Sequence, residues 1–430
     1  MSETSDTYTI DPGGKKKVIL AVDGGGMRGA IVLAILAELE EKSGKSCHEI
    51  FDMFVGTSTG AIISAGLAAG YSAKELQDDK KLYRGLLRDA FNANPPQFWW
   101  IQGAFSIAFI QFGQLATGIG AFLIEVLLIV FRLMAFIVLT VAFLILFLYN
   151  LVKKNAMINF IGRIMSHGLR YAYPMQPFLD RLQPLIEARG VKKMSDIKDK
   201  ILLTTTKNLQ TGETAFIVNK GAGGAKFKDW LISDAVAGSG AAPIFFDAHK
   251  ARFFDGGVSP FGNPCFIAAV EAMEYIGAPE GFTDGNVILV SIGTGYPPDD
   301  IKTEHDVTKK NFFEWMQYVI SQGLDDAINQ QVFVTRKIYG VTGPKAIDFR
   351  RYNISLIRAD VEKLGVPIPA NLDPEKLGLD SSRLDEVDFM AALGKAYAQQ
   401  IDWSKNDTLP WDFVGGQPDP EDARTNNPDW

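Results

Sequence analysis

One short segment, Gly56-Thr57-Ser58-Thr59-Gly60, restricts the fold of this chain more than any other. It follows the apolar run 53–55 and precedes the helix-like run 61–65, so it predicts a strand that turns sharply into a helix. Such a turn needs small residues on both sides, here Gly56 and Gly60, and it projects the side chain at its apex into a cleft. Ser58 is therefore a candidate nucleophile, although a glycine-rich chain can produce this pattern by chance.

A second unit of strand, glycine turn and helix lies upstream. The apolar run 18–22 has the length of a buried strand, Asp23-Gly24-Gly25-Gly26-Met27-Arg28-Gly29 follows it at once, and a helical pattern covers 30–42. The glycines leave backbone N–H groups uncovered and the start of the helix adds partial positive charge, so the loop suits an anion. Two anions fit: a bound phosphate, or the oxyanion that forms when a serine attacks an ester.

The same loop also matches a dinucleotide-binding pattern. Gly24, Gly26 and Gly29 satisfy Gly-x-Gly-x-x-Gly, and acidic residues lie near the distance that a ribose contact requires, at Glu40, Glu41 and Glu49. A single match of this kind is a weak signal, so a nucleotide site is the less favoured interpretation.

A third glycine turn, Phe253-Phe254-Asp255-Gly256-Gly257, places an aspartate at the end of an aromatic strand. Taken alone, Asp-Gly-Gly is more often a plain turn. The preceding segment, 235–246, is rich in small residues, which would let the end of a helix pack closely beneath a site. Asp255 is therefore a candidate catalytic residue only in combination with the other two turns.

The four histidines argue against a triad of serine, histidine and acid. In the α/β-hydrolase order the base histidine follows both partners, and only His305 follows Asp255, within a highly charged segment. His48 and His167 stand in no recognisable base motif, and His249 in its charged turn is interpreted as a surface residue. A carboxylate is the remaining base, and Asp255 is the best-placed candidate to take the Ser58 proton.

Together these segments resemble the patatin-like phospholipases, a family that includes bacterial acyl hydrolases and the calcium-independent phospholipases A2. The resemblance rests on four blocks in the family's order, 23–29, 56–60, 237–246 and 255–257. The later Ser291-Ile292-Gly293-Thr294-Gly295 also looks like the family's strand and glycine turn after the acid. The resemblance implies a three-layer αβα fold around a mainly parallel sheet, and a dyad of Ser58 and Asp255 that requires no metal and no cofactor.

The resemblance also assigns the neighbours of the dyad. It implies that backbone N–H groups of Gly25, Gly26 and Met27 stabilise the oxyanion. Gly24 and Gly29 lie at the two ends of this glycine loop. Arg28 would position this loop or meet a lipid phosphate. Gly56 and Gly60 would shape the nucleophile turn, and Gly256 and Gly257 the acid turn.

The region 99–152 departs from the family. Its only charges are Glu125 and Arg132, and 133–152 has none, which is long enough to cross a bilayer. We predict a helical hairpin, with a first arm over 96–112, a turn at 113–120 and a second arm over 121–152. A buried core helix is the competing interpretation, but the run has no polar face. Assembly of the arms with copies from other subunits, as a homo-oligomer, is a further alternative.

Ser58 precedes this insertion and Asp255 follows it, so both flanks must return to one catalytic domain. We predict that this domain comprises 15–98 and 153–409, between a flexible arm at 1–14 and a flexible tail at 410–430. Basic residues flank both ends of the insertion while its proposed turn has none, and the positive-inside rule then places the catalytic domain on the cytoplasmic side.

Composition limits the partners and the compartment. The net charge is −7 with no long basic run, which argues against a nucleic-acid partner. The two cysteines, Cys47 and Cys265, predict no disulfide framework and a reducing compartment, and neither has a metal-ligand neighbourhood.

The sequence therefore predicts a membrane-associated serine acyl hydrolase of the phospholipase A or lysophospholipase type, acting on a membrane lipid. Two alternatives remain. One is a non-catalytic membrane scaffold with the same fold, and the other is a nucleotide-binding protein that uses the Gly24 to Gly29 loop.

Overall fold

The computed structural model describes residues 16–78, 85–86, 122–153, 162–164, 167, 171–296, 327–340 and 347–401. Several predicted features lie outside these residues: the arm 1–14, the tail 410–430, the hairpin arm 96–112, its turn 113–120, and His305.

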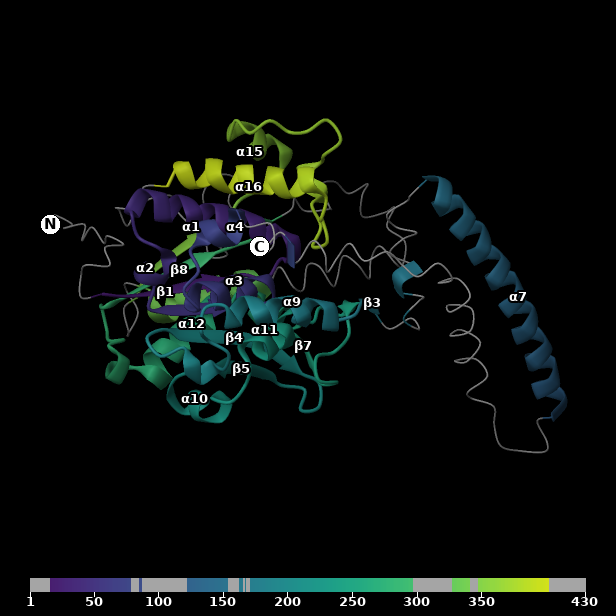
Figure 1. Cartoon of the computed structure of the whole chain (residues 1–430), viewed down its shortest axis with the longest axis horizontal. Coiled ribbons are helices and arrows are strands. Elements are labelled where there is room, and N and C mark those ends of the chain that lie inside the picture. Colours follow the sequence, from purple (N-terminus) through teal and green to yellow (C-terminus); the bar gives the residue numbers. More distant parts are fainter. Residues whose placement is uncertain are drawn as a thin grey trace, which may run out of the picture.

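A seven-stranded sheet forms the centre of the molecule (Figure 1). Six strands follow the order β5-β4-β2-β1-β8-β9, and β7 pairs with β4 beside this path. The neighbours among β4, β2, β1, β8 and β9 are parallel, whereas β5 and β7 run antiparallel to β4. The strands are β1 Lys17–Val22, β2 Met53–Gly56, β4 Ile201–Asn208, β5 Thr214–Val218, β7 Phe253–Asp255, β8 Val287–Ile292 and β9 Asp348–Tyr352. A small second sheet pairs β3 (Tyr171–Tyr173) with β6 (Ile244–Phe246) in parallel.

Helices cover both faces of the sheet, which explains why its central strands are apolar throughout. Val18, Leu20 and Val22 of β1 pack into one core with α1, α3, α11 and α16. Ile19 and Ala21 point to the other face, into a core with α12 and a helix over 327–339. The helices are α1 Gly29–Ser43, α2 Cys47–Ile50, α3 Thr59–Ala68, α4 Ala73–Asp78, α9 Gln176–Glu187, α10 Gly221–Phe227, α11 Ile232–Gly240, α12 Cys265–Val270, α15 Arg358–Lys363 and α16 Leu384–Gln399. The predicted α/β fold with a mainly parallel sheet is confirmed.

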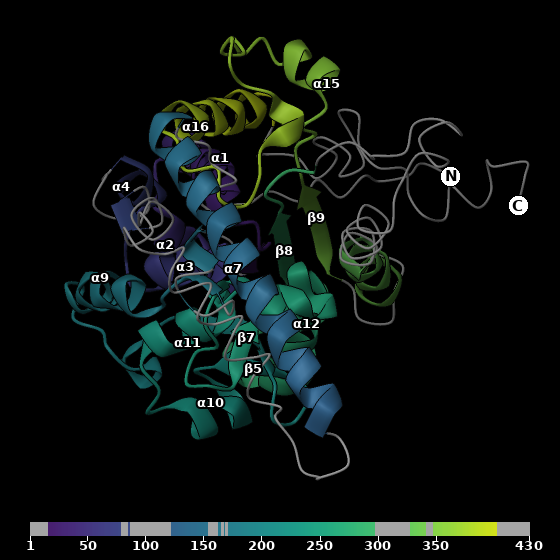
Figure 2. The ribbon, with the colours of Figure 1, turned by 90° about the vertical axis from the view of Figure 1, so that its right-hand side faces the viewer.

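One further helix, α7 (Phe122–Lys153), stands apart from the α/β domain on the side where β3 lies (Figures 1 and 2). It coincides with the predicted second arm of the insertion. Large apolar side chains along it are about half exposed: Val130, Leu133, Met134, Ile137, Val138, Val141, Ile145, Leu148 and Tyr149. Among the described residues, no helix was found that combines the length and the apolarity needed to span a membrane, so the predicted crossing is not supported.

Candidate active site

Strand β4 aligns the two turns that carry Ser58 and Asp255. β2 pairs with the first half of β4 and ends with Gly56 opposite Thr204, whereas β7 pairs with the second half in the opposite direction and ends with Asp255 opposite Thr206. Because a strand rises about 3.4 Å per residue, the ends of β2 and β7 face each other across roughly 7 Å. Each strand thus delivers its turn to the same point of the sheet.

Ser58 occupies the apex of the turn between β2 and α3. Its backbone has φ 56° and ψ −121°, a conformation that costs a residue with a side chain about 1–3 kcal/mol. The turn is tight, since a Cβ on Gly56 would lie 2.2 Å from the carbonyl carbon of Gly60, and one on Gly60 would lie 2.2 Å from the carbonyl oxygen of Val22. The Ser58 N–H donates to Oγ of Ser239 on α11 at 2.9 Å. The side chain of Ser58 is half-buried, so it is held firmly and still reachable.

Asp255 is buried beside Ser58. Its carboxylate accepts a hydrogen bond at 2.7 Å from the N–H of Gly257, and the Ser58 side chain lies close enough to influence its pKa. Burial raises the pKa of Asp255 to about 6, although the Ser58 hydroxyl and the Gly257 N–H both act to lower it. A carboxylate with a pKa near neutrality suits a general base, because it is ionised at pH 7 and still binds a proton readily.

The glycine loop adjoins this pair. A Cβ on Gly24 would lie 3.3 Å from Cβ of Ser58, so the loop backbone passes directly beside the serine. Gly26 has φ +55°, and a Cβ there would lie 2.2 Å from the carbonyl oxygen of Leu379. That carbonyl accepts the N–H of Met27 at 2.8 Å, so this predicted oxyanion donor has another acceptor in the structure. Within the described part of the chain, the Gly25 N–H makes no hydrogen bond.

The loop then turns into helix. The 3-10 helix η1 (Gly26–Arg28) leads into α1, which begins at Gly29. Arg28 ends η1 and is half-buried. The loop therefore lies at the start of a helix, where the helix dipole favours an anion.

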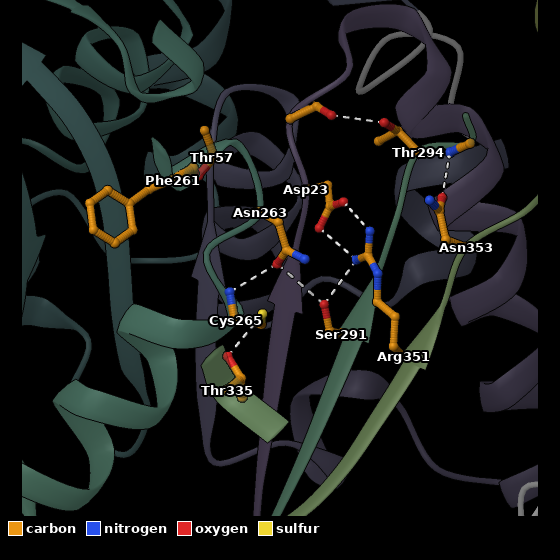
Figure 3. Close-up of polar contacts among 12 residues, drawn as sticks. Asp23, Thr57, Phe261, Asn263, Cys265, Ser291, Thr294, Thr335, Arg351 and Asn353 are labelled. Carbon is orange, nitrogen blue, oxygen red and sulfur yellow. Dashed lines mark hydrogen bonds and ion pairs between the residues drawn. The ribbon is translucent and has the colours of Figure 1, made fainter. Parts of the chain in front are cut away.

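A buried ion pair between Arg351 and Asp23 holds the start of the glycine loop (Figure 3). Arg351 on β9 donates from Nη1 to Oδ1 of Asp23 at 2.8 Å and from Nη2 to Oδ2 at 2.5 Å. The same guanidinium donates to Oγ of Ser291 at 2.9 Å. Burial acts to lower the pKa of Arg351, but the charge and hydrogen bonds of Asp23 outweigh it and raise that pKa above its ordinary value. The pair thus fixes the residue that begins the glycine loop.

The turn after β8 supports the loop as well. Thr294 donates from Oγ1 to the carbonyl of Gly24 at 2.7 Å, and Asn353 accepts the N–H of Gly295 at 3.0 Å (Figure 3). The sequence pattern predicts the turn that contains Thr294 but not its contact with Gly24. The contacts of Arg351 and Ser239 could not be predicted either, because their positions depend on strand and helix packing.

The histidines of the described residues bond elsewhere. Nδ1 of His48 pairs with the carbonyl of Leu67 at 2.9 Å, and Nδ1 of His167 with that of Arg163 at 2.9 Å. The interpretation of His249 as a surface residue is wrong, because it is 6% exposed and its Nε2 lies 3.0 Å from Oδ1 of Asp234. Its charged sequence neighbours concealed this buried pair.

The remaining candidate residues support the fold and lie outside the active site. Glu40 accepts the N–H groups of Cys47 at 2.7 Å and Ala73 at 2.9 Å, and Glu49 caps α2. Two of the three acids considered for a ribose contact therefore accept hydrogen bonds from backbone N–H groups. Cys265 is buried, and burial raises the pKa of its thiol to about 12. The described residues contain no cluster of three or more His, Cys, Asp or Glu that could hold a metal ion.

A family model described as patatin-like phospholipase matches residues 20–269, more than half of the chain and all four sequence blocks. The chain belongs to the patatin-like phospholipase family. The central sheet with its covering helices is the α/β fold of that family.

Curated relatives match this chain over short stretches. Calcium-independent phospholipase A2-gamma of Rattus norvegicus is 42% identical over 86 residues, 20% of this chain and 11% of that protein. The cGAMP-activated phospholipase of Vibrio cholerae is 45% identical over 67 residues, 14% of this chain and 19% of that protein. The cUMP-AMP-activated phospholipase of Escherichia coli is 38% identical over 78 residues, 16% of this chain and 24% of that protein. The alignments with these three relatives thus span less than a quarter of each relative's length.

Among solved structures, VipD from Legionella pneumophila matches with a TM-score of 0.29 and 14% identity, covering 89% of this chain and 67% of that chain.

Proposed function

We propose that this protein is a serine acyl hydrolase that cleaves the ester bond of a membrane lipid, as a phospholipase A or lysophospholipase. The observation that carries this proposal is the placement of Ser58, on its strained turn, beside the buried Asp255, whose pKa is raised to about 6. Membership of the patatin-like phospholipase family supports the same conclusion.

In the proposed reaction, Oγ of Ser58 attacks the ester carbonyl carbon while Asp255 takes the serine proton. The resulting oxyanion meets the backbone N–H groups of the glycine loop, that of Gly25 among them, and the N-terminus of α3. The bond between the carbonyl carbon and the alcohol oxygen then breaks, and the proton on Asp255 passes to the departing alcohol. The acyl group remains on Ser58.

Deacylation repeats these steps with water as the nucleophile. Asp255 takes a proton from water, the hydroxide attacks the acyl carbon, and the proton returns to Ser58 as the fatty acid leaves. Arg28, at the end of the glycine loop, would position that loop or meet a lipid phosphate.

Exposed apolar side chains near the site support a lipid substrate. Val258 follows the acid turn and is 46% exposed, and Leu379, whose carbonyl contacts Gly26, is 40% exposed. Ile244 is 60% exposed and lies three residues after Ala241, whose carbonyl accepts the Asp255 N–H at 3.0 Å. Apolar groups that stay exposed around a polar site suit a substrate with acyl chains.

We further propose that α7 brings the catalytic domain to the membrane surface, on the cytoplasmic side. The exposed apolar side chains of α7 support contact with lipid, and the basic residues on both flanks of the insertion support the orientation. The alternative is that α7 pairs with a second copy of the chain.

Digestion of a membrane lipid extract tests the hydrolase proposal. The purified protein should release fatty acids and lysolipids, detected by mass spectrometry, and Ser58→Ala should release none. Ser64→Ala is the matched control, because Ser64 is a buried serine on α3 that takes no part in the dyad. Equal release by Ser58→Ala, or no release by the unmodified protein from any lipid class, would contradict the proposal.

Vesicle sedimentation tests the role of α7. A variant with Ile137→Asp and Val141→Asp should stay in the supernatant while the unmodified protein sediments with the vesicles. Hydrolysis of a soluble short-chain ester should be the same for both proteins. If the variant loses an oligomer and still sediments with vesicles, α7 is a subunit contact and the membrane role is wrong.

A further inference from the structure

We propose that Thr57 and Thr205 form a hydroxyl latch that positions Ser58 against Asp255. The inference rests on the proposed dyad and adds two positioning residues to it. Neither threonine touches the reacting atoms in this account, so the latch acts only through the two turns.

The direction of the hydrogen bonds follows from the geometry. Thr57 directly precedes Ser58 and donates from Oγ1 to the carbonyl of Phe261 at 2.6 Å. Its Oγ1 also lies 2.7 Å from Oγ1 of Thr205. A hydroxyl carries one proton, and Thr57 gives its proton to the carbonyl, so the Thr205 hydroxyl must be the donor to Thr57. Both threonines are fully buried, which removes water as a competing partner.

The latch reaches both sides of the dyad. Thr205 stands on β4 between Thr204, which pairs with Gly56, and Thr206, which pairs with Asp255. A Cβ on Gly256 would lie 2.1 Å from Oγ1 of Thr205, so the acid turn packs directly on this hydroxyl.

Phe261 lies in the 3-10 helix η5 (Pro260–Gly262), just after the acid turn, and Figure 3 shows it beside Thr57. The relay from Thr205 to Thr57 to Phe261 therefore ties the nucleophile turn to the segment that carries the acid.

The proposed proton transfer requires that the two turns stay aligned. Ser58 is held in a strained conformation and its contact with Asp255 must survive substrate binding. Because a misplacement of about 1 Å can lower a rate by about a hundredfold, loosening the two turns should reduce kcat and leave the KM for substrate nearly unchanged.

A pair of neighbouring substitutions tests the latch. Thr205→Val keeps the volume of the side chain and removes the donor to Thr57. Thr204→Val is the matched control, since Thr204 is equally buried and its hydroxyl makes only a 3.4 Å contact with the carbonyl of Ala235. We expect kcat to fall by about tenfold or more in Thr205→Val and to stay within about twofold in Thr204→Val. Thr205→Ser should restore the rate.

The pH profile gives a second readout. The nearby Ser58 hydroxyl lowers the pKa of Asp255, so moving it away should shift the acidic limb of kcat/KM to higher pH in Thr205→Val. A substitution that only weakened the fold would lower the melting temperature without moving this limb.

Thr57→Val, alone and combined with Thr205→Val, completes a double-mutant cycle. If the two hydroxyls act as one relay, the double variant should lose little more activity than either single variant. The latch is wrong if Thr205→Val and Thr204→Val have equal kcat, or if the two effects multiply independently, while Ser58→Ala is inactive. Activity that persists in Ser58→Ala would instead overturn the proposed dyad itself.

Discussion

The nucleophile turn and the glycine loop are both corners between a strand and a helix, yet they are held in place differently. The shape of the nucleophile turn follows from its own sequence, because Gly56 and Gly60 allow the close approach that leaves Ser58 at the apex, and contacts from α11 and β4 only steady it. The glycine loop depends on distant residues: Arg351 holds Asp23, and the Leu379 carbonyl accepts the Met27 N–H. The shape of one half of the site is therefore specified locally, and that of the other half by the packing of β8, β9 and the segment before α16.

This difference implies two separate ways to disable the site. A change at the dyad should remove the chemistry and leave the fold intact. A change behind the glycine loop should weaken the fold and the rate together.

The largest effect on rate is expected for Asp255→Asn. An amide cannot take the Ser58 proton, so kcat should fall by about 10²- to 10⁴-fold while the melting curve stays cooperative. Steady-state kinetics on a lipid ester measures this. Asp234→Asn is the control, because Asp234 is also largely buried but pairs with His249. Comparable losses in both variants would mean that Asp255 has no special role.

Breaking the ion pair that holds the glycine loop should mainly lower the stability of the fold. Arg351→Met leaves the Asp23 carboxylate buried without its partner, which should lower the free energy of unfolding by about 3–5 kcal/mol and reduce kcat as well. Denaturant unfolding measures the first effect. Asp23→Asn in the same chain should recover part of the stability, since it removes the uncompensated charge.

The neighbouring Arg350 supplies the contrast. Arg350→Met breaks an equally buried pair with Asp348, at 2.7 Å, on the other face of β9. It should destabilise the protein to a similar extent but spare kcat per folded molecule. If both arginine variants lose the same kcat, the loop is not held specifically by Arg351.

Asp255→Asn should also change the pH dependence of stability. The fold raises the pKa of Asp255 from 3.8 to about 6, so its contribution to stability is present below pH 4 and is lost as the pH rises through 6. Removing the charge should stabilise the protein at pH 8 by up to about 3 kcal/mol relative to the effect at pH 4. Urea unfolding at the two pH values tests this, and a variant that is destabilised equally at both would contradict it.

The smallest effect is expected for Thr294→Val. It removes the 2.7 Å hydrogen bond to the Gly24 carbonyl, which should lower stability by about 1 kcal/mol and kcat severalfold. Thr335→Val is the control, since Thr335 is fully buried and donates within its own helix to Gln331. A normal kcat in Thr294→Val would show that the loop keeps its position without this contact.

The same comparison explains how much of the molecule the sequence could predict. The turn at Ser58 and the strand before the glycine loop follow from local spacing, so their placement required no tertiary knowledge. Ser239, Thr205 and Arg351 could not be predicted, because their contacts depend on which strands and helices pack together. The burial of His249 could not be predicted for the same reason, since its partner Asp234 lies on α11.

Labelling with a fluorophosphonate across pH tests whether Asp255 activates Ser58. We expect one adduct, located on Ser58 by peptide mass spectrometry, whose rate of formation rises through about pH 6 as Asp255 loses its proton. In Asp255→Asn the rate should be slow and flat across that range. An adduct on another residue, or the same rise with pH in Asp255→Asn, would mean that Asp255 does not activate Ser58.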